Sequence, residues 1–433
     1  MAFVVRLQLL MERKELWHLG LKSIQTLEVQ RGILASGREE AYGCVFGRDS
    51  LITALELLRT HRYRPTPGLL PLVRKILRSL ADLQGTEHMI ESGEEPGKII
   101  HEFRTEGHEH LTRRDNADLP AYERAWYIYP DGAMRNYDSV DATPLFLMAL
   151  HRYAEVSGDD AFLEELETHA RNALGWVLRQ NDLIVYAFPP DRRHGGLRTQ
   201  SWMDSGESLF YEHGTTTPPY PIAPLEVQAY AWAALSMWSM HFAGVDTLLS
   251  AQLHQKACAL KATFNNRFVI KHGQSISLAF ALDGNGKQLT SPRSSMGHVL
   301  WAAYNGACIL QLEYVPLIVK RLMMRDLFVP GAGIRTLSSR SSRFDPHSYH
   351  NGSIWPHDTA LIAEGFENFG FSDDAHRVRD GLLRSYEYFQ TPIELFAYKY
   401  KLREYAPASG HRACRTQAWS AAGLLLSIAA DEA

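Results

Sequence analysis

The sequence has few of the features that mark several large classes of protein. It contains only four cysteines in 433 residues, and no two of them form a C-x-x-C pair. A disulfide framework and a cysteine-based zinc motif are therefore not expected, and isolated thiols indicate a reducing compartment. No segment approaches the roughly 18 consecutive apolar residues of a membrane span. The N-terminal run MAFVVRLQLLMERK is too short and too charged for a signal peptide. We expect a soluble, cytoplasmic protein with no membrane partner.

The charge pattern and the standard motifs exclude further classes. The net charge is −4, and the lysines and arginines are scattered, so no nucleic-acid partner is expected. The chain has no G-x-S-x-G, P-loop or G-x-G-x-x-G sequence. His347, His350 and His357 lie close together but lack the partner set of a zinc site. We expect neither a metal nor a cofactor.

The apolar residues of the chain follow a helical period through most of its length. The 45% hydrophobic content is ample for a large core. A 3.6-residue period predicts helices at 10–30, 49–63, 68–84, 141–157, 160–179, 222–243, 246–267, 296–309, 313–328, 352–370, 373–389 and 413–431. Short breaks such as SGDD and AGVD join several of them into pairs, which predicts six helical hairpins in a ring. Strand-like pieces occur at 183–189 and 275–282, the second followed by a DGNG turn. No linker divides the chain, so residues 1–433 are expected to form one domain.

The segments between these pairs are rich in acids and aromatic residues. Five of the nine tryptophans lie in or near them: Trp126, Trp202, Trp301, Trp355 and Trp419. Aromatic faces can stack on the C–H face of a sugar ring, while fixed polar groups bind its hydroxyls. In a ring of hairpins, these connections would gather around one central pocket, so a carbohydrate is the expected partner.

Taken in order, these segments resemble a known family. They include FGRDS at 46–50, EPGKIIHE at 95–102, SVDATPLF at 139–146, QSWMDSGES at 200–208, SYHNGSIWPHDTALIA at 348–363, ELF at 394–396 and QAWSAAG at 417–423. This series resembles the amylo-α-1,6-glucosidase domain at the C-terminus of glycogen debranching enzymes. The resemblance implies an all-α six-hairpin, or (α/α)6-barrel, glycosidase with long loops and minor β elements at one end. It also implies an inverting, exo-acting α-glycosidase that releases a terminal sugar, with glucose expected, from an α-1,6-linked glucan or oligosaccharide.

The resemblance implies a catalytic pair of carboxyl groups. The general acid falls on Asp141 and the general base on Glu394, and an inverting glycosidase needs one of each. From the residues alone, Thr143 and Pro144 predict a helix start, so Asp141 lies in the preceding loop, where a second capping role is the alternative. Glu394 could equally begin a solvated turn. Its segment reads P-I-E-L-F, a partial match, which keeps Glu404 as the alternative base.

Further polar and aromatic residues in the same motifs are expected to bind the sugar. Arg48 and Asp49 form an adjacent donor and acceptor, and Trp202 with Asp204 offers stacking beside a hydroxyl acceptor. Glu226, inside a helical segment, is either a partner of other site residues or a hydroxyl ligand. The remaining candidates are His101, Glu102, Arg335, Trp355, His357, Asp358, Gln417 and Trp419.

Two features separate this chain from a debranching enzyme. We expect no polymer-handling domain beside this one, and segment 105–136 is long, polar and then aromatic. We expect this segment to form a lid on the leaving-group side of the pocket, with a surface insertion as the alternative. A hydrolase of a small α-glycoside, such as a compatible-solute glucoside or an oligosaccharide, is therefore the alternative function. A phosphorylase, an epimerase and a non-catalytic sugar-binding protein are further alternatives, and the oligomeric state stays open.

Overall fold

Two concentric rings of helices form the framework of the structure, a computed structural model that describes residues 12–114 and 119–433. The N-terminal run discussed above falls mostly outside these residues. The inner ring contains α2 (Gly47–Tyr63), α5 (Ala142–Ser157), α7 (Leu225–Phe242), α9 (Met296–Trp301), α11 (Pro356–Glu367) and α13 (Ala418–Asp431). Each inner helix packs on the next, and α13 closes the ring against α2. The expected six-hairpin arrangement is therefore present.

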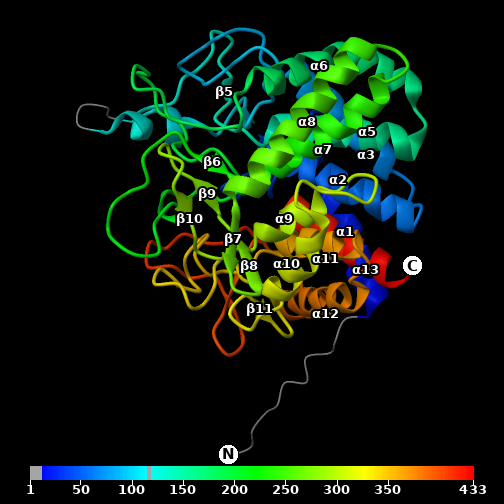
Figure 1. The fold of residues 1–433 in the computed structure, drawn as a ribbon, viewed down its shortest axis with the longest axis vertical. Coiled ribbons are helices and arrows are strands. Elements are labelled where there is room, and N and C mark those ends of the chain that lie inside the picture. Colours follow the sequence, from blue (N-terminus) through cyan, green and yellow to red (C-terminus); the bar gives the residue numbers. More distant parts are fainter. Residues whose placement is uncertain (1–11, 115–118) are drawn as a thin grey trace, which may run out of the picture.

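The outer ring supplies one partner for each inner helix. Its members are α1 (Arg13–Leu27), α3 (Leu69–Asp82), α6 (Asp160–Arg179), α8 (Thr247–Arg267), α10 (Val315–Leu322) and α12 (Ser372–Phe389). The pairs in contact are α2 with α3, α5 with α6, α7 with α8, α9 with α10, α11 with α12, and α13 with α1. Figure 1 shows the last pair, at the two ends of the described chain, side by side on the right.

The burial of each ring follows from its sequence. The inner helix α13 reads AWSAAGLLLSIAAD and is buried along nearly its whole length, because it touches neighbours on every side. The outer helix α3 is amphipathic instead, and buries Leu69, Leu72, Val73, Ile76 and Leu80 in a stripe at helical spacing. Short turns join four of the inner helices to their outer partners, whereas residues 302–314 form a longer link from α9 to α10. At two of the short turns an aspartate caps the outer helix: Asp159 accepts from the Phe162 N–H, and Asp246 from the Leu249 N–H.

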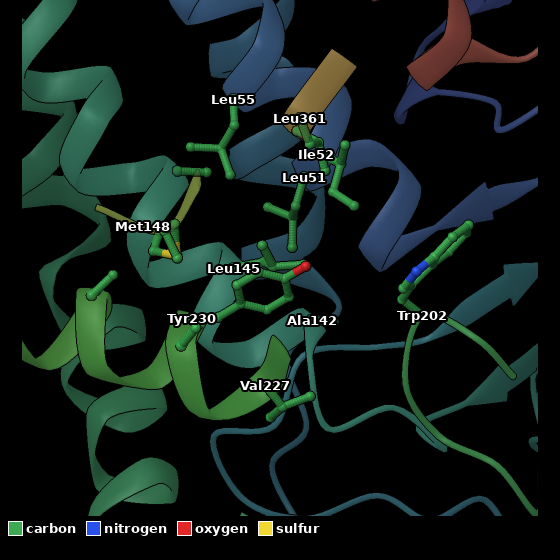
Figure 2. Close-up of a cluster of buried hydrophobic side chains, with 14 of the residues drawn as sticks. Leu51, Ile52, Leu55, Ala142, Leu145, Met148, Trp202, Val227, Tyr230 and Leu361 are labelled. Atoms are coloured by element: carbon green, nitrogen blue, oxygen red, sulfur yellow. The ribbon is translucent and has the colours of Figure 1, made fainter. Parts of the chain in front are cut away.

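Side chains fill the centre of the inner ring. Figure 2 shows Leu51, Leu55, Leu145 and Met148 from α2 and α5 meeting there, with Trp202 set apart on a loop at one end. These four side chains are at most 9% exposed. Truncating a buried leucine of this kind to alanine costs about 2–5 kcal/mol. Among the described residues, no helix combines the length and apolar character needed to cross a membrane.

Long connections run from each outer helix to the next inner helix and carry all of the short strands. Figure 1 shows many of them on the left, around β5, β6, β9 and β10, while β7, β8 and β11 lie nearer the middle beside α10. The strands are β1 (Glu28–Val29), β2 (Gly32–Ile33), β3 (Val45–Phe46), β4 (Glu102–Arg104), β5 (Met134–Asn136), β6 (Ala223–Pro224), β7 (Val269–His272), β8 (Ser275–Leu278), β9 (Ala281–Leu282), β10 (Gln288–Leu289), β11 (Phe328–Val329), β12 (Gly333–Ile334), β13 (Phe396–Tyr398) and β14 (Leu402–Glu404). All pairings are antiparallel, in small sheets such as β3–β4–β5 and β10–β9–β6. Three short helices complete these connections: α4 (Glu109–Thr112), η1 (Ala121–Glu123) and η2 (Gly206–Ser208); a fourth, η3 (Leu312–Tyr314), precedes α10.

Three predictions of local structure need correction. The strand expected at 183–189 is reduced to a single bridge between Tyr186 and Ile222, because the Gln228 side chain bonds both the N–H and the C=O of Ile184 in place of a neighbouring strand. The helix expected at 296–309 ends at Trp301, before a turn with a positive φ at Asn305. Helix α5 begins at Ala142, two residues before the expected start at Pro144. Thr143 does not cap it, since its hydroxyl accepts from the Ile99 N–H instead.

Candidate active site

A pocket lies where the long connections enter the N-terminal ends of inner helices α2, α11 and α13. Its lining residues are Tyr42, Phe46, Arg48, Asp49, His101, Trp202, Asp204, Tyr349, His350, Trp355, Glu394, Gln417 and Trp419. They come from segments far apart in the chain, because the connections all reach the same end of the barrel. Nine of them were predicted from the sequence: Arg48, Asp49, His101, Trp202, Asp204, Trp355, Glu394, Gln417 and Trp419.

Arg48 is the electrostatic centre of the pocket. This side chain, 3% exposed, donates from Nε to Asp141 at 2.6 Å and from Nη1 to Asp204 at 3.0 Å. Burial lowers the pKa of Arg48, but Asp141, Asp204 and Asp49 raise it by more, so the net shift is upward. The guanidinium therefore stays charged and fixes the two carboxylates that it bonds.

Two further acids, Glu394 and Asp49, face the pocket and have raised pKa values. Burial raises the pKa of Glu394 to about 7, and hydrogen bonds from Tyr349 and Cys414 oppose that rise. Burial also raises the pKa of Asp49 to about 7, against the lowering effect of Arg48. Carboxyl groups that titrate near neutrality inside a pocket are typical of acid–base catalysis.

Asp204 combines access to the pocket with a raised pKa. Its side chain is 26% exposed, whereas that of Asp141 is fully buried. Burial raises the pKa of Asp204 and Arg48 lowers it, with a net upward shift. A partly exposed carboxyl that holds its proton longer than usual can act as a proton donor to a bound molecule.

An aromatic box forms one side of the pocket. Trp202 meets Trp355 and Trp419 edge-on, with ring centroids 5.1 and 6.0 Å away. His350 stacks on Trp355 at 5.2 Å, and His357 stacks on Trp419 at 3.7 Å. Rings held at right angles to one another present both faces and edges, which suits a sugar ring.

Several buried polar atoms of the lining have no hydrogen-bond partner among the described residues. They are Arg48 Nη2, His101 Nδ1, Trp202 Nε1, Gln417 Oε1 and Trp419 Nε1. An unpaired polar atom in a protein interior costs about 1–3 kcal/mol, so such groups are rare unless they have another partner. Donors and an acceptor from four connections around one pocket are what a polyhydroxyl ligand requires.

Asp141, the predicted general acid, lies behind this lining. One of its carboxylate oxygens accepts from Arg48 and the other from the Ser139 hydroxyl at 2.5 Å, and the residue does not line the pocket. It stands at the N-cap position of α5 without a side-chain capping bond, which removes the alternative capping role. Its contacts are those of a residue that holds Arg48 in place.

Five other predicted ligands also lie outside the lining. Glu102 pairs with Arg104, and the Arg335 guanidinium lies near the Phe344 and Tyr398 rings. Asp358 pairs with His298 at 2.6 Å. Glu226 is fully buried in the first turn of α7, and His357 is fully buried behind Trp419. These residues surround or support the pocket rather than face it.

Glu394 and its alternative Glu404 occupy different environments. The Cys414 N–H donates to Glu394 Oε2 at 2.7 Å, and the Tyr349 hydroxyl donates to Oε1. Glu404, in contrast, ends strand β14 with a 72% exposed side chain near Arg415. The pocket therefore contains Glu394 and not Glu404.

Four lining residues were not predicted as ligands: Tyr42, Phe46, Tyr349 and His350. Each lies inside one of two segments between the helix pairs, YGCVFGRDS or SYHNGSIWPHD. The signal that could have found them was the motif itself, since aromatic residues next to its charged positions face the same pocket. Across the described residues, no group of three or more His, Cys, Asp or Glu side chains is arranged to hold a metal ion.

The described part of segment 105–136 packs beside the neighbouring connection. Tyr122 meets Phe188 edge-on at 6.3 Å, Tyr127 meets His194 at 5.2 Å, and the Gly195 N–H bonds the Ala125 carbonyl. None of its described residues lines the pocket. Residues 115–118 fall outside the described residues, and the lid stays a prediction.

Comparison with known proteins agrees with the six-hairpin fold. Residues 227–405 match the family model for the mannosylglycerate hydrolase MGH1-like glycoside hydrolase domain. The fold is similar to that of the GH63 mannosylglycerate hydrolase from Thermus thermophilus, with a TM-score of 0.62, 14% identity, and 95% of this chain and 99% of that chain covered. It is also similar to a glycosidase solved in complex with glucose, with a TM-score of 0.58, 17% identity and 97% of both chains covered. None of the curated proteins matches the sequence. The chain thus has the fold of the six-hairpin glycosidases.

Proposed function

We propose that this protein is an inverting glycoside hydrolase that releases a terminal sugar from a small α-glycoside. The observation that carries the proposal is the pocket itself. It combines three carboxyl groups, an aromatic box and unpaired buried donors at the end of a six-hairpin barrel. The family match over residues 227–405 and the small-glycoside hydrolase among the structural neighbours support it.

We assign the general base to Glu394 and the general acid to Asp204 in place of Asp141. Asp204 reaches the pocket and keeps a raised pKa, whereas both oxygens of Asp141 are engaged with Arg48 and Ser139. In an inverting reaction, Asp204 protonates the leaving oxygen as the glycosidic bond breaks. Glu394 removes a proton from the water that attacks the opposite face of the sugar ring. The net reaction adds one water across the bond.

The substrate is expected to be a short glycoside such as a glucosyl or mannosyl derivative of glycerate or a disaccharide. The mannosylglycerate hydrolase among the structural neighbours is the observation that favours a short substrate over a polymer. The second candidate is the amylo-α-1,6-glucosidase activity that the motifs between residues 42 and 423 favour. The two differ in the aglycone, so a single substrate panel distinguishes them.

The test is incubation of the purified protein with mannosylglycerate, glucosylglycerate, isomaltose, panose and glycogen limit dextrin, with free sugar measured by chromatography. Release from the small glycosides alone supports the main proposal. Preference for panose and limit dextrin supports the debranching-type activity. Binding without any release, seen by calorimetry, would contradict both and leave a sugar-binding protein.

A further inference from the structure

Two tyrosines form a hydrogen-bonded chain that ends on Glu394. The Tyr349 hydroxyl contacts Oε1 of Glu394, and the hydroxyl oxygens of Tyr349 and Tyr42 are 3.0 Å apart. A tyrosine has only one hydroxyl proton. When Tyr349 donates this proton to the Glu394 carboxylate, its hydroxyl oxygen can only accept in the contact with Tyr42, so Tyr42 is the donor there. The order of the chain is therefore Tyr42, Tyr349, Glu394.

The chain is held rigidly from several sides. The Tyr349 ring meets Trp355 at 4.9 Å, His350 at 4.7 Å and His411 at 5.6 Å. The second oxygen of Glu394 accepts the Cys414 N–H at 2.7 Å. Each carboxylate oxygen thus has at least one fixed donor, and the Cys414 side chain adds a further hydrogen bond to this carboxylate.

We propose that Tyr349, itself oriented by Tyr42, is a positioning residue that holds the Glu394 carboxylate in the orientation required of the catalytic base. This inference rests on the proposed function. A base must lie within hydrogen-bond reach of its water, in a fixed direction, and a carboxylate held at only one oxygen would rotate. The aromatic cage prevents Tyr349 from turning away, and the backbone donor of Cys414 fixes the other oxygen.

The same contact tunes the ionisation of the base. Burial raises the pKa of Glu394, and the hydrogen bond from Tyr349 is the largest of the effects that lower it again. Loss of that hydroxyl is therefore expected to raise the pKa of Glu394 further. Other titratable groups lie close enough to Glu394 for one to change the pKa of the other. They are Glu40, Tyr42, Asp49, Tyr405 and Cys414.

The decisive variant is Tyr349→Phe, which removes the hydroxyl and keeps the ring in its cage. We expect kcat to fall about 10- to 100-fold with KM within about threefold, because a base out of position affects chemistry more than binding. We also expect the limb of the kcat/KM–pH profile that reports Glu394 to move upward by about 0.5–1 pH unit. Tyr42→Phe should move the same limb in the same direction by less, and it replaces Tyr349→Phe if that protein does not fold.

The matched control is Tyr405→Phe. Its ring lies 5.9 Å from that of Tyr349, but its hydroxyl is not part of the chain. We expect its pH profile to equal that of the wild type. An unmoved Glu394 limb in Tyr349→Phe, or an equal shift in Tyr405→Phe, would overturn the inference.

A carboxyl titration separates this inference from the proposed function. If the wild-type protein hydrolyses none of the glycosides, the proposed function is wrong. The Glu394 carboxyl can still be followed by ¹³C NMR in labelled protein, with Glu394→Gln used to assign its signal. A higher pKa of Glu394 in Tyr349→Phe then supports the inference that Tyr349 positions Glu394, and an unchanged pKa contradicts it.

Discussion

The assignment of the general acid can be tested by pairing two substitutions with two substrates. Asp204→Asn removes a proton donor but keeps an amide that can accept from Arg48. Asp141→Asn removes a buried charge on the other side of the same guanidinium. A natural glycoside needs its leaving oxygen protonated, whereas a glycosyl fluoride of the same sugar does not, since fluoride departs as an anion.

For Asp204→Asn the expected loss depends on the leaving group. General acid catalysis contributes about 10²–10⁴-fold. We therefore expect kcat on the natural glycoside to fall about 10³-fold and kcat on the fluoride to change less than about tenfold. The melting temperature should remain close to that of the wild type, because this side chain is partly exposed and the amide keeps a hydrogen bond to Arg48.

For Asp141→Asn the expected change is mainly in stability. Removing one partner of a buried ion pair costs about 3–5 kcal/mol, and the lower end applies because Arg48 keeps Asp204. The entropy of unfolding at about 2.1 cal/mol/K per residue converts a loss of about 3 kcal/mol into a fall of about 3 °C in a chain of 433 residues. Any loss of activity should be equal on the two substrates.

The assays are initial rates on both substrates and differential scanning calorimetry of each variant. The reasoning is refuted if Asp141→Asn loses far more activity on the glycoside than on the fluoride while Asp204→Asn loses both equally. That result would return the general acid to Asp141, as the resemblance implies.

Three further predictions address stereochemistry and pH. Proton NMR of the reaction on an α-glycoside should show the β-anomer of the released sugar first, whereas the α-anomer first would indicate a retaining mechanism. Because the base must be ionised and burial raises the pKa of Glu394 to about 7, kcat/KM should fall as the pH drops below about 7; a profile flat down to about pH 5 would contradict this. Glu56, buried on α2 near Glu364, has a pKa raised well above 4.5, first by burial and then by Glu364. Its folded form holds the proton longer than the unfolded form, so stability is lost as the pH rises above 4.5. Glu56→Gln should therefore raise the melting temperature more at about pH 8 than at about pH 5, and an equal change at both would refute it.

The helical ring could be predicted from sequence because its period is local. The stripe Leu69, Leu72, Val73, Ile76 and Leu80 requires an amphipathic helix wherever α3 lies in the fold. The small strands were harder, since a two- or three-residue strand depends on its partner rather than on its own residues. Residues 183–189 show this, because a side chain from α7 takes the hydrogen bonds that a neighbouring strand would have supplied.

The pocket was predictable as a set of motifs but not as a set of contacts. Arg48, Trp202 and Glu394 were found because their motifs belong to connections that meet at one end of the barrel. Sequence could not show which carboxyl faces inward, because that depends on how Arg48 divides its donors between Asp141 and Asp204. Both aspartates lie in a motif, and both contact the same guanidinium, yet only one is exposed to the pocket.

This division of donors also explains why the site needs so many acids. Arg48 is buried, and an unpaired guanidinium there would be costly. Asp141 neutralises it from behind, at full burial, so the charge is matched even when Asp204 is protonated. Asp204 can then gain and lose its proton without leaving Arg48 without a partner. Under the proposed assignment, the fully buried aspartate supplies stability and the partly exposed one is available for chemistry. In the proposed mechanism, the two aspartates keep the buried charge of Arg48 paired whether or not Asp204 carries a proton. The Asp204 substitution should therefore act on the glycoside more than on the fluoride, and the Asp141 substitution should act mainly on the melting temperature.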